Sequence, residues 1–121
     1  MAVVRYIVDD VDVAVTFYTQ RLGFKVDRRM GPAFASVLRD DLTLWLAGPQ
    51  SSAARQMPDG RRPQAGGWNR FVIEVEDIEA IINELKKTGI RFRNEIVPGP
   101  GGKQILLEDP SGNPVELFEP A

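Results

Sequence analysis

The sequence predicts an α+β fold built from two similar modules, each with the order strand, helix, strand, strand, strand. The pattern of the first half of the chain recurs in the second half with an offset of 67 residues, which places Asp10 on Asp77 and Val11 on Ile78. The whole chain has only 121 residues, and half of that length is too short to bury a core alone. We therefore expect the two modules to pack together.

The first module is expected to begin with a strand over residues 3–8, where β-branched residues follow an alternating pattern. A helix should follow, because Asp9 and Asp10 are good N-cap residues and Gly23 is typical of the position after a helix end. Its apolar face, at helical spacing, consists of Val11, Ala14, Val15, Tyr18 and Leu22. Three more strands are expected at residues 24–29, 34–38 and 42–47, with turns at Gly31-Pro32 and Asp40-Asp41.

Residues 49–67 have a different composition, rich in proline, glycine, serine and arginine and poor in large apolar side chains. A loop of this length in a compact domain is usually either functional or disordered. Two interpretations stay open from the sequence: a mobile linker between the modules, or a lid over a ligand site.

The second module repeats the pattern. A strand is expected over residues 68–75, then a helix that Asp77 caps and Gly89 ends. The apolar face of that helix consists of Ile78, Ile81, Ile82 and Leu85. Strands are then expected at residues 90–97, 103–108 and 114–119.

Two residue types are missing from the chain, and their absence excludes several kinds of chemistry. There is no cysteine, so disulfides, thiolate metal sites and cysteine nucleophiles are excluded. There is no histidine, so imidazole metal ligands, Ser-His triads and histidine acid–base catalysis are excluded as well. Any chemistry must come from other polar side chains, backbone groups or a bound cofactor.

Charge and hydropathy exclude two classes of partner. The net charge is −2, whereas a nucleic-acid-binding protein usually carries a basic surplus. No uncharged apolar run approaches the ~18–20 residues that span a bilayer. Asp9, Asp10 and Asp12 interrupt the apolar segment that a signal peptide needs. We therefore expect a cytoplasmic protein that binds neither nucleic acid nor membrane.

Two motifs make a family resemblance specific. The first consists of Asp10-Val11-Asp12, Ala14, Phe17-Tyr18 and Leu22-Gly23-Phe24, and the second is the run Glu-Asp-Pro-Ser-Gly-Asn-Pro-Val-Glu-Leu at residues 108–117. Together they resemble the opening and closing motifs of the vicinal oxygen chelate superfamily, which includes glyoxalase I, the bleomycin-resistance proteins and the extradiol dioxygenases. The resemblance covers nearly the whole chain apart from the central loop.

The resemblance implies a single domain over residues 1–121, made of module 1–48, loop 49–67 and module 68–121. In that fold each mixed sheet curls, the pair encloses a cavity, and the helices lie outside. The resemblance also implies a homodimer, because many members of this size pair through edge strands or exchange modules.

The resemblance further assigns four positions to metal ligands, two in the first strands and two in the last strands of the modules. In this sequence they are Val3, Arg70, Trp45 and Glu116, and only Glu116 matches. One carboxylate cannot replace a set of three or four nitrogen and oxygen ligands. We therefore expect the protein to bind neither a metal ion nor a cofactor. The alternative is a Mg²⁺ ion held by Glu116 and water molecules.

Strand alternation indicates which side chains face the expected cavity. Thr43 and Trp45 lie opposite a run of leucines, and Glu116 lies opposite Val115 and Leu117. The same argument gives the expected ligand-binding residues as Arg5, Thr43, Trp45, Trp68, Arg70, Arg93 and Gln104.

We expect Arg70 to neutralise Glu116, because an unpaired buried carboxylate is costly. The arginines would recognise an anionic or carbonyl group, and the two tryptophans would form flat apolar walls. Each of these features also has a purely structural interpretation: an inherited ion pair, and tryptophans in a core or dimer interface.

Three functions follow. The first is a metal-independent protein that binds and sequesters a drug or metabolite, similar to the bleomycin-resistance proteins, with an anionic, aromatic or neutral polar ligand. The second is a glyoxalase-like lyase or isomerase in which Glu116 is the general base, although a nearby arginine weakens a carboxylate in that role. The third is a non-catalytic dimeric domain with a vestigial cavity.

Overall fold

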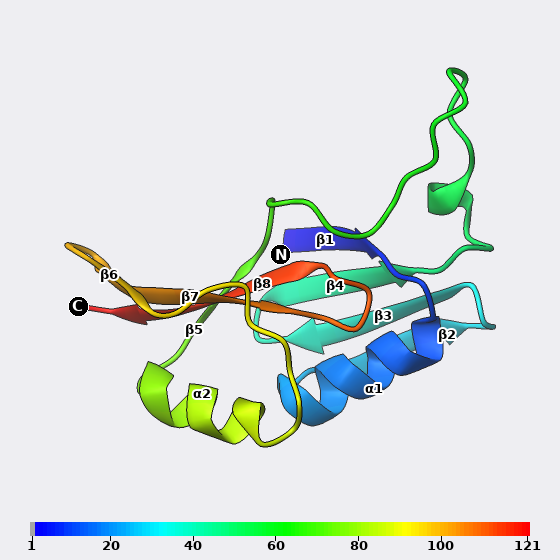
Figure 1. The fold of residues 1–121 in the computed structure, drawn as a ribbon. Coiled ribbons are helices and arrows are strands. Elements are labelled where there is room, and N and C mark those ends of the chain that lie inside the picture. The colour runs from blue at the N-terminus through cyan, green and yellow to red at the C-terminus, as the bar shows by residue number, and fades with distance from the viewer. Residues whose placement is uncertain (1) are drawn as a thin grey trace. The chain divides into compact units, whose positions relative to one another are not determined.

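The computed structural model describes residues 2–121. The chain divides into two compact units, Met1–Gly66 and Gly67–Ala121. Each unit contains one four-stranded mixed sheet and one α-helix (Figure 1). This arrangement confirms the predicted α+β fold of two repeated modules. Within the described residues, neither α-helix is long and apolar enough to cross a membrane.

The first unit follows the predicted order of elements closely. Its strands and helix are β1 (Ala2–Ile7), α1 (Val11–Arg21), β2 (Lys25–Met30), β3 (Phe34–Arg39) and β4 (Leu42–Ala47). The sheet order is β1-β4-β3-β2, with β1 parallel to β4 and the other pairs antiparallel. The strand and helix bounds agree with the predicted ones to within one or two residues.

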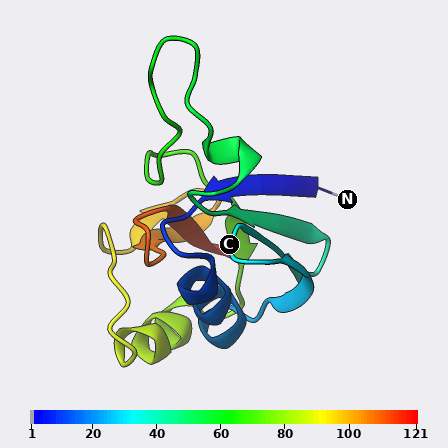
Figure 2. The same cartoon turned by 90° about the vertical axis from the view of Figure 1, so that its right-hand side faces the viewer.

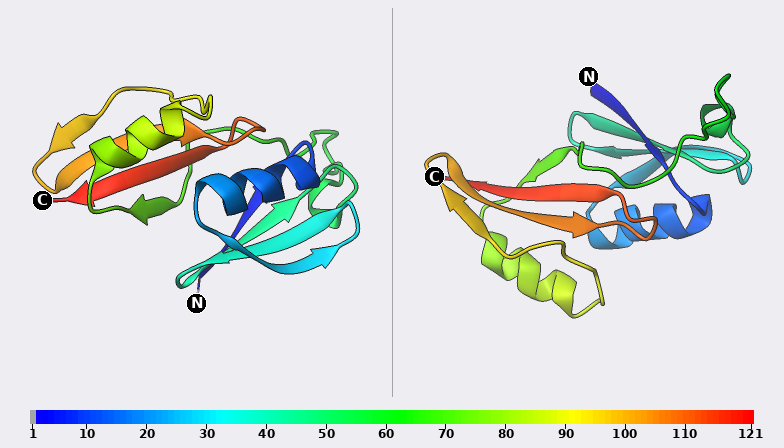
Figure 3. Two further views of the ribbon diagram at one scale, coloured as in Figure 1. Left: turned by 90° about the horizontal axis from the view of Figure 1, so that it is seen from below. Right: turned by 45° about the horizontal axis from the view of Figure 1, so that its top comes forward.

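Helix α1 packs on β2, β3 and β4 and covers one face of this sheet (Figure 3). Its N-cap is Asp10, whose carboxylate accepts a hydrogen bond from the backbone N–H of Val13 at 3.1 Å. Tyr18 is fully buried, and its ring meets those of Phe17 and Phe24 edge to face at 5.1 and 5.4 Å. The aromatic residues of the first motif therefore form the core under this sheet.

The segment after β4 contains a short 3-10 helix, η1 (Ser52–Ala54), with Ala54 buried. Beyond it the chain makes an exposed turn that extends away from β1 (Figure 2). The turn is closed by the bond from the Met57 N–H to the Arg61 carbonyl at 2.7 Å and by the ion pair of Arg61 with Asp59 at 2.8 Å. The predicted loop thus has local order of its own.

The second unit repeats the first with shorter elements. They are β5 (Val72–Glu74), α2 (Ile78–Lys86), β6 (Val97–Gly99), β7 (Gly102–Glu108) and β8 (Pro114–Pro120). The sheet order is β5-β8-β7-β6, again with one parallel pair, β5 and β8. Helix α2 contacts β8, and Asp77 caps it as predicted.

The strand predicted over residues 68–75 is wrong in length, since only Val72–Glu74 is a strand. In the observed register Val72 lies beside Glu116, so Arg70 would continue the ladder beside Pro114. Proline has no N–H and cannot donate a ladder hydrogen bond. The Glu116 N–H donates a sheet hydrogen bond to the Phe71 carbonyl at 3.1 Å, next to this end of β5.

The strand predicted over residues 90–97 is interrupted. Phe92 forms an isolated bridge with Leu107, and β6 begins only at Val97. Between them the side-chain carbonyl of Asn94 accepts the hydrogen bond of the Leu106 N–H at 2.9 Å. This side chain takes the place of a backbone partner, so the ladder stops there.

The registers show that the two sheets repeat the same geometry. Arg5 lies beside Trp45 in the first unit, and Val72 lies beside Glu116 in the second. In each sheet the alternate residues are buried on the helix side, for example Leu44, Leu46, Val115 and Leu117. We call the opposite side the helix-free face. In the first unit it carries Val3, Arg5, Phe34, Ser36, Thr43 and Trp45, and in the second Val72, Gln104, Leu106, Glu108, Glu116 and Phe118.

Gly102 provides a test of the β6–β7 turn. Its φ is +147°, and a Cβ there would lie 2.1 Å from the Glu119 carbonyl oxygen on β8, whereas a Cβ on neighbouring Gly101 meets nothing within 4 Å. We expect Gly102→Ala to lower the free energy of unfolding by about 3 kcal/mol or more. Gly101→Ala should leave it nearly unchanged. Chemical denaturation of both variants measures the difference, and equal stabilities would contradict this packing.

Candidate functional site

Glu116 lies on the helix-free face of the second unit, on an inner strand of its sheet. Its neighbours Val115 and Leu117 are buried on the helix side, so alternation directs the Glu116 carboxylate to the opposite side. The flanking strands place Val72 and Leu106 beside it. Glu116 is only 7% exposed, and such a carboxylate needs a charge partner.

That partner is Arg70, as predicted. Its Nε and Nη2 atoms donate to the same Glu116 oxygen, Oε1, at 3.0 and 2.8 Å. Nη1 donates to the Trp68 carbonyl at 3.2 Å, so the irregular segment before β5 holds the guanidinium in place. No residue in the described part of the chain donates a side-chain hydrogen bond to the second oxygen, Oε2. Glu116 therefore keeps one acceptor oxygen for water or a ligand.

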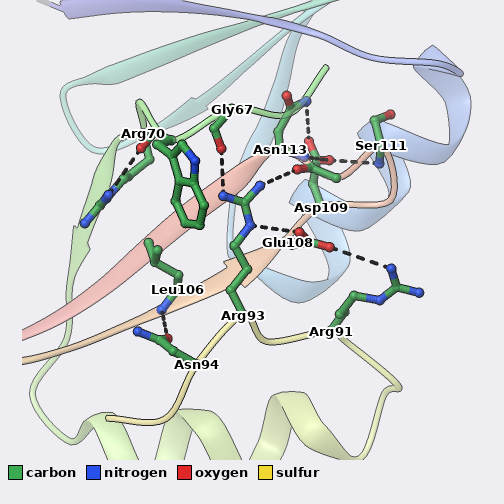
Figure 4. Close-up of polar contacts among 12 residues, drawn as sticks. Gly67, Arg70, Arg91, Arg93, Asn94, Leu106, Glu108, Asp109, Ser111 and Asn113 are labelled. Carbon is green, nitrogen blue, oxygen red and sulfur yellow. Dashed lines mark hydrogen bonds and ion pairs between the residues drawn. The ribbon is translucent and has the colours of Figure 1, made fainter. Parts of the chain in front are cut away.

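Arg93 ties three segments of the second unit together (Figure 4). Its Nε donates to Glu108 at 2.8 Å, Nη1 to the Gly67 carbonyl at 2.6 Å and Nη2 to the Gly112 carbonyl at 2.9 Å. The side chain is only 15% exposed. Arg93 was predicted as a ligand-binding residue, but three of its N–H groups are used to hold the protein together.

The turn between β7 and β8 contains the Asp-Pro-Ser-Gly-Asn part of the closing motif, residues 109–113, and its hydrogen bonds require these residue types. One carboxylate oxygen of Asp109 accepts from the backbone N–H groups of Ser111 and Asn113 at 2.8 and 2.9 Å, and the other accepts from the Asn113 side chain at 3.0 Å (Figure 4). Gly112 has a φ of +85°, a region that favours glycine. The motif fixes the turn that presents the Gly112 carbonyl to Arg93.

Trp68 lies at the edge of an open pocket of about 510 Å³ in the second unit. The guanidinium of Arg93 stacks on its ring at 4.7 Å, yet the residue is 69% exposed. Arg91, also exposed, lies 3.9 Å from Glu108 and contributes a second positive charge. The pocket is lined by Gly67, Trp68, Arg91, Phe92, Arg93 and Glu108. Two guanidinium groups against one carboxylate give it a positive surplus.

The helix-free face of the first unit brings together Arg5, Thr43 and Trp45. The Arg5 guanidinium lies 4.8 Å from the centre of the Trp45 ring, and Phe34 meets the same ring edge to face at 5.8 Å. Thr43 is 5% exposed, and its hydroxyl has no hydrogen-bond partner in the described chain. A buried hydroxyl without a partner costs about 1–3 kcal/mol.

The predicted site residues therefore form two groups, one in each unit. Arg5, Thr43 and Trp45 share one sheet face, and Arg70, Glu116, Trp68 and Arg93 lie in the second unit. Gln104 is half-buried on β7, beside Phe118, and makes no side-chain bond to the Glu116 pair. Sequence reasoning did not assign Glu108 or Phe34, although strand alternation along β7 and β3 places both side chains on the helix-free faces.

The comparisons with known proteins bear on this fold directly. A family model described as Glyoxalase/Bleomycin resistance protein/Dioxygenase superfamily matches residues 1–117. The chain belongs to this superfamily. The predicted resemblance to the vicinal oxygen chelate proteins is confirmed.

Individual relatives include proteins with different names. A probable chloroplastic lactoylglutathione lyase of Arabidopsis thaliana is 28% identical over an alignment of 125 positions that covers 96% of this chain and 34% of the relative. The chain thus spans about a third of that relative's length. Two solved structures share the fold at 22% identity and 98% coverage of this chain. One is a lactoylglutathione lyase of Agrobacterium tumefaciens (TM-score 0.78, 92% of that chain), and the other is TnmS3, an antibiotic-binding protein of Streptomyces sp. CB03234 (TM-score 0.74, 93% of that chain).

The residues at the four positions that the resemblance assigns to metal ligands do not fit a metal centre. Val3 and Trp45 offer no donor atom, and Arg70 directs its cationic group onto Glu116. Within residues 2–121, no three Asp or Glu side chains gather in a group that could hold an ion. A divalent cation at Glu116 would have to displace a guanidinium that makes two hydrogen bonds.

The Arg70–Glu116 pair can be tested by a double-mutant cycle. Arg70→Met leaves a buried carboxylate unpaired and should lower the free energy of unfolding by about 2–3 kcal/mol. The double variant Arg70→Met with Glu116→Gln should recover most of that loss. Arg91→Met, which removes the exposed partner of a 3.9 Å ion pair with Glu108, should change stability by about 0.5 kcal/mol or less. Additive losses for the two substitutions would show that the pair is not coupled.

Proposed function

We propose that this chain is a small-molecule-binding protein that works without a metal ion, in the way that the resemblance to the bleomycin-resistance proteins suggests. The observation that carries the proposal is the bond pair from Arg70 to Glu116. It provides, within the chain, the positive charge that a metal ion would otherwise supply to this carboxylate. The proposal includes a cytoplasmic location and a homodimeric assembly.

The pocket beside Trp68 is suited to a planar ligand that carries a negative or partly negative oxygen. An exposed indole offers a stacking surface, and the positive surplus of Arg91 and Arg93 over Glu108 favours a carboxylate or carbonyl oxygen. An anionic aromatic, or a neutral aromatic with hydroxyl and carbonyl groups, combines these features. The name of TnmS3, an antibiotic-binding protein, is consistent with such a use of this fold.

An enzyme of the glyoxalase-like lyase or isomerase type is the second candidate. The free Oε2 of Glu116 and the name of the 28% identical relative favour it. Against it, Arg70 already makes two hydrogen bonds to Oε1 of Glu116, which leaves a single oxygen to take a proton from a substrate. A lactoylglutathione lyase assay, with and without added zinc or nickel, decides between the two: the binding proposal predicts no turnover in either case.

Ligand affinity should not depend on metal. We expect the dissociation constant for an aromatic carboxylate such as 2-naphthoate to agree within about twofold before and after treatment with EDTA and after addition of Mg²⁺, Zn²⁺ or Ni²⁺. Isothermal titration calorimetry measures it. Binding that disappears with EDTA and returns with one of these ions would contradict the proposal.

Trp68 should matter for binding and little for folding. Trp68→Ala removes a stacking surface and should weaken 2-naphthoate binding about tenfold. Because the side chain is mostly exposed, the stability loss should stay within about 1 kcal/mol, the value of its contact with Arg93. Trp68→Phe keeps an aromatic face and should lose less affinity. A stability loss with no change in affinity would indicate a purely structural residue.

A further inference from the structure

Thr43 has an unusual environment in the first unit. It lies on β4, an inner strand, with Val3 of β1 and Leu38 of β3 directly beside it. It is 5% exposed, and its hydroxyl has no hydrogen-bond partner among the described residues. Buried polar groups nearly always have a hydrogen-bond partner, so a buried hydroxyl without one requires an explanation. A valine would fill the same space without this cost.

The residues next to Thr43 on the helix-free face form a stacking surface with a positive charge. Trp45 is half-buried and braced by Phe34 at 5.8 Å. Arg5 lies over the indole at 4.8 Å, and within residues 2–121 no carboxylate forms an ion pair with it. A cation held in place by an aromatic ring and lacking a counter-charge is suited to an anionic ligand.

From these observations we propose that the helix-free face of the first unit binds a planar aromatic acid. The ring system stacks beside Trp45, its carboxylate pairs with Arg5, and a hydroxyl or carbonyl oxygen on the far side bonds to the Thr43 hydroxyl. Arg5 and Thr43 are diagonal neighbours on β1 and β4, so their Cα atoms lie about 8 Å apart. One ligand of two-ring size can therefore lie between these neighbouring positions.

This inference rests on the proposed function, because it names the ligand class that the binding protein takes. It uses different residues from the pocket beside Trp68, and its failure can therefore be separated from failure of the proposal. Its probes are 6-hydroxy-2-naphthoate, which carries both groups, 2-naphthoate, which lacks the hydroxyl, and 2-naphthol, which lacks the carboxylate. Isothermal titration calorimetry gives the affinity of each.

The decisive variant is Thr43→Val. We expect it to lower the affinity for 6-hydroxy-2-naphthoate about tenfold, the value of one hydrogen bond to a buried partner, and to leave 2-naphthoate unchanged. Its thermal midpoint should be equal to or higher than that of the wild type, because an unpaired buried hydroxyl is removed. Thr43→Ser keeps the hydroxyl and should keep the preference for the hydroxylated probe. Thr16→Val, at an exposed helical position, is the control.

At the first-unit site, Arg5→Gln should weaken both naphthoates about tenfold and leave 2-naphthol unchanged, since only the acids carry the charge that Arg5 pairs with. Binding at the pocket beside Trp68, fitted as a separate class of site, should stay as in the wild type. Arg21→Gln, on the exposed side of α1, is the matched control. The inference is overturned if Thr43→Val retains the preference for the hydroxylated probe, or if wild-type protein does not bind 6-hydroxy-2-naphthoate at millimolar concentration. If the first-unit variants have no effect while Trp68→Ala weakens binding, this inference fails and the proposed function stands.

Discussion

The ion pair between Arg70 and Glu116 is the interaction on which the chemistry of the second unit depends. Burial of Glu116 on an inner strand makes a charge partner necessary. Arg70 is available as that partner because it lies in the irregular segment before β5, where its Nη1 also donates to the Trp68 carbonyl. The pair leaves Glu116 with one acceptor oxygen and a fixed neutralising charge, which suits recognition of a ligand better than proton abstraction.

The two units keep one backbone geometry and carry different side chains on it. In the first unit Trp45 takes the register position of Glu116, and Arg5 takes that of Val72. The Arg5 guanidinium stacks on the Trp45 indole, whereas in the second unit Arg70, the counterpart of Val3, pairs with the carboxylate. On the first face, Arg5 has no ion-pair partner among the described residues, and the Thr43 hydroxyl has no hydrogen-bond partner among them. In our proposal these two groups bind an acid. On the second face Arg70 neutralises Glu116 within the chain. In our proposal the repeat thus provides two different binding surfaces from one fold.

Much of this organisation could be predicted from the sequence, because it depends on local patterns. Strand alternation, the aspartate caps and the repeat offset identified the helices, the first sheet and the position of Glu116. The parts that could not be predicted depend on non-local partners. The strand ladder before β6 stops because the side-chain carbonyl of Asn94 accepts the hydrogen bond of the Leu106 N–H. Arg93 is not free for a ligand because two of its N–H groups donate to carbonyls from two loops. Composition gives no sign of either contact, nor of a hydroxyl left unpaired at Thr43.

The central claim is that an internal guanidinium has replaced metal coordination at Glu116. Native mass spectrometry combined with elemental analysis tests it most directly, on protein purified without chelators or a histidine tag. We predict a mass that contains no zinc, nickel or iron in stoichiometric amount, and an adduct small enough to be an aromatic metabolite. One equivalent of a transition metal per chain, lost in Glu116→Gln, would contradict the account.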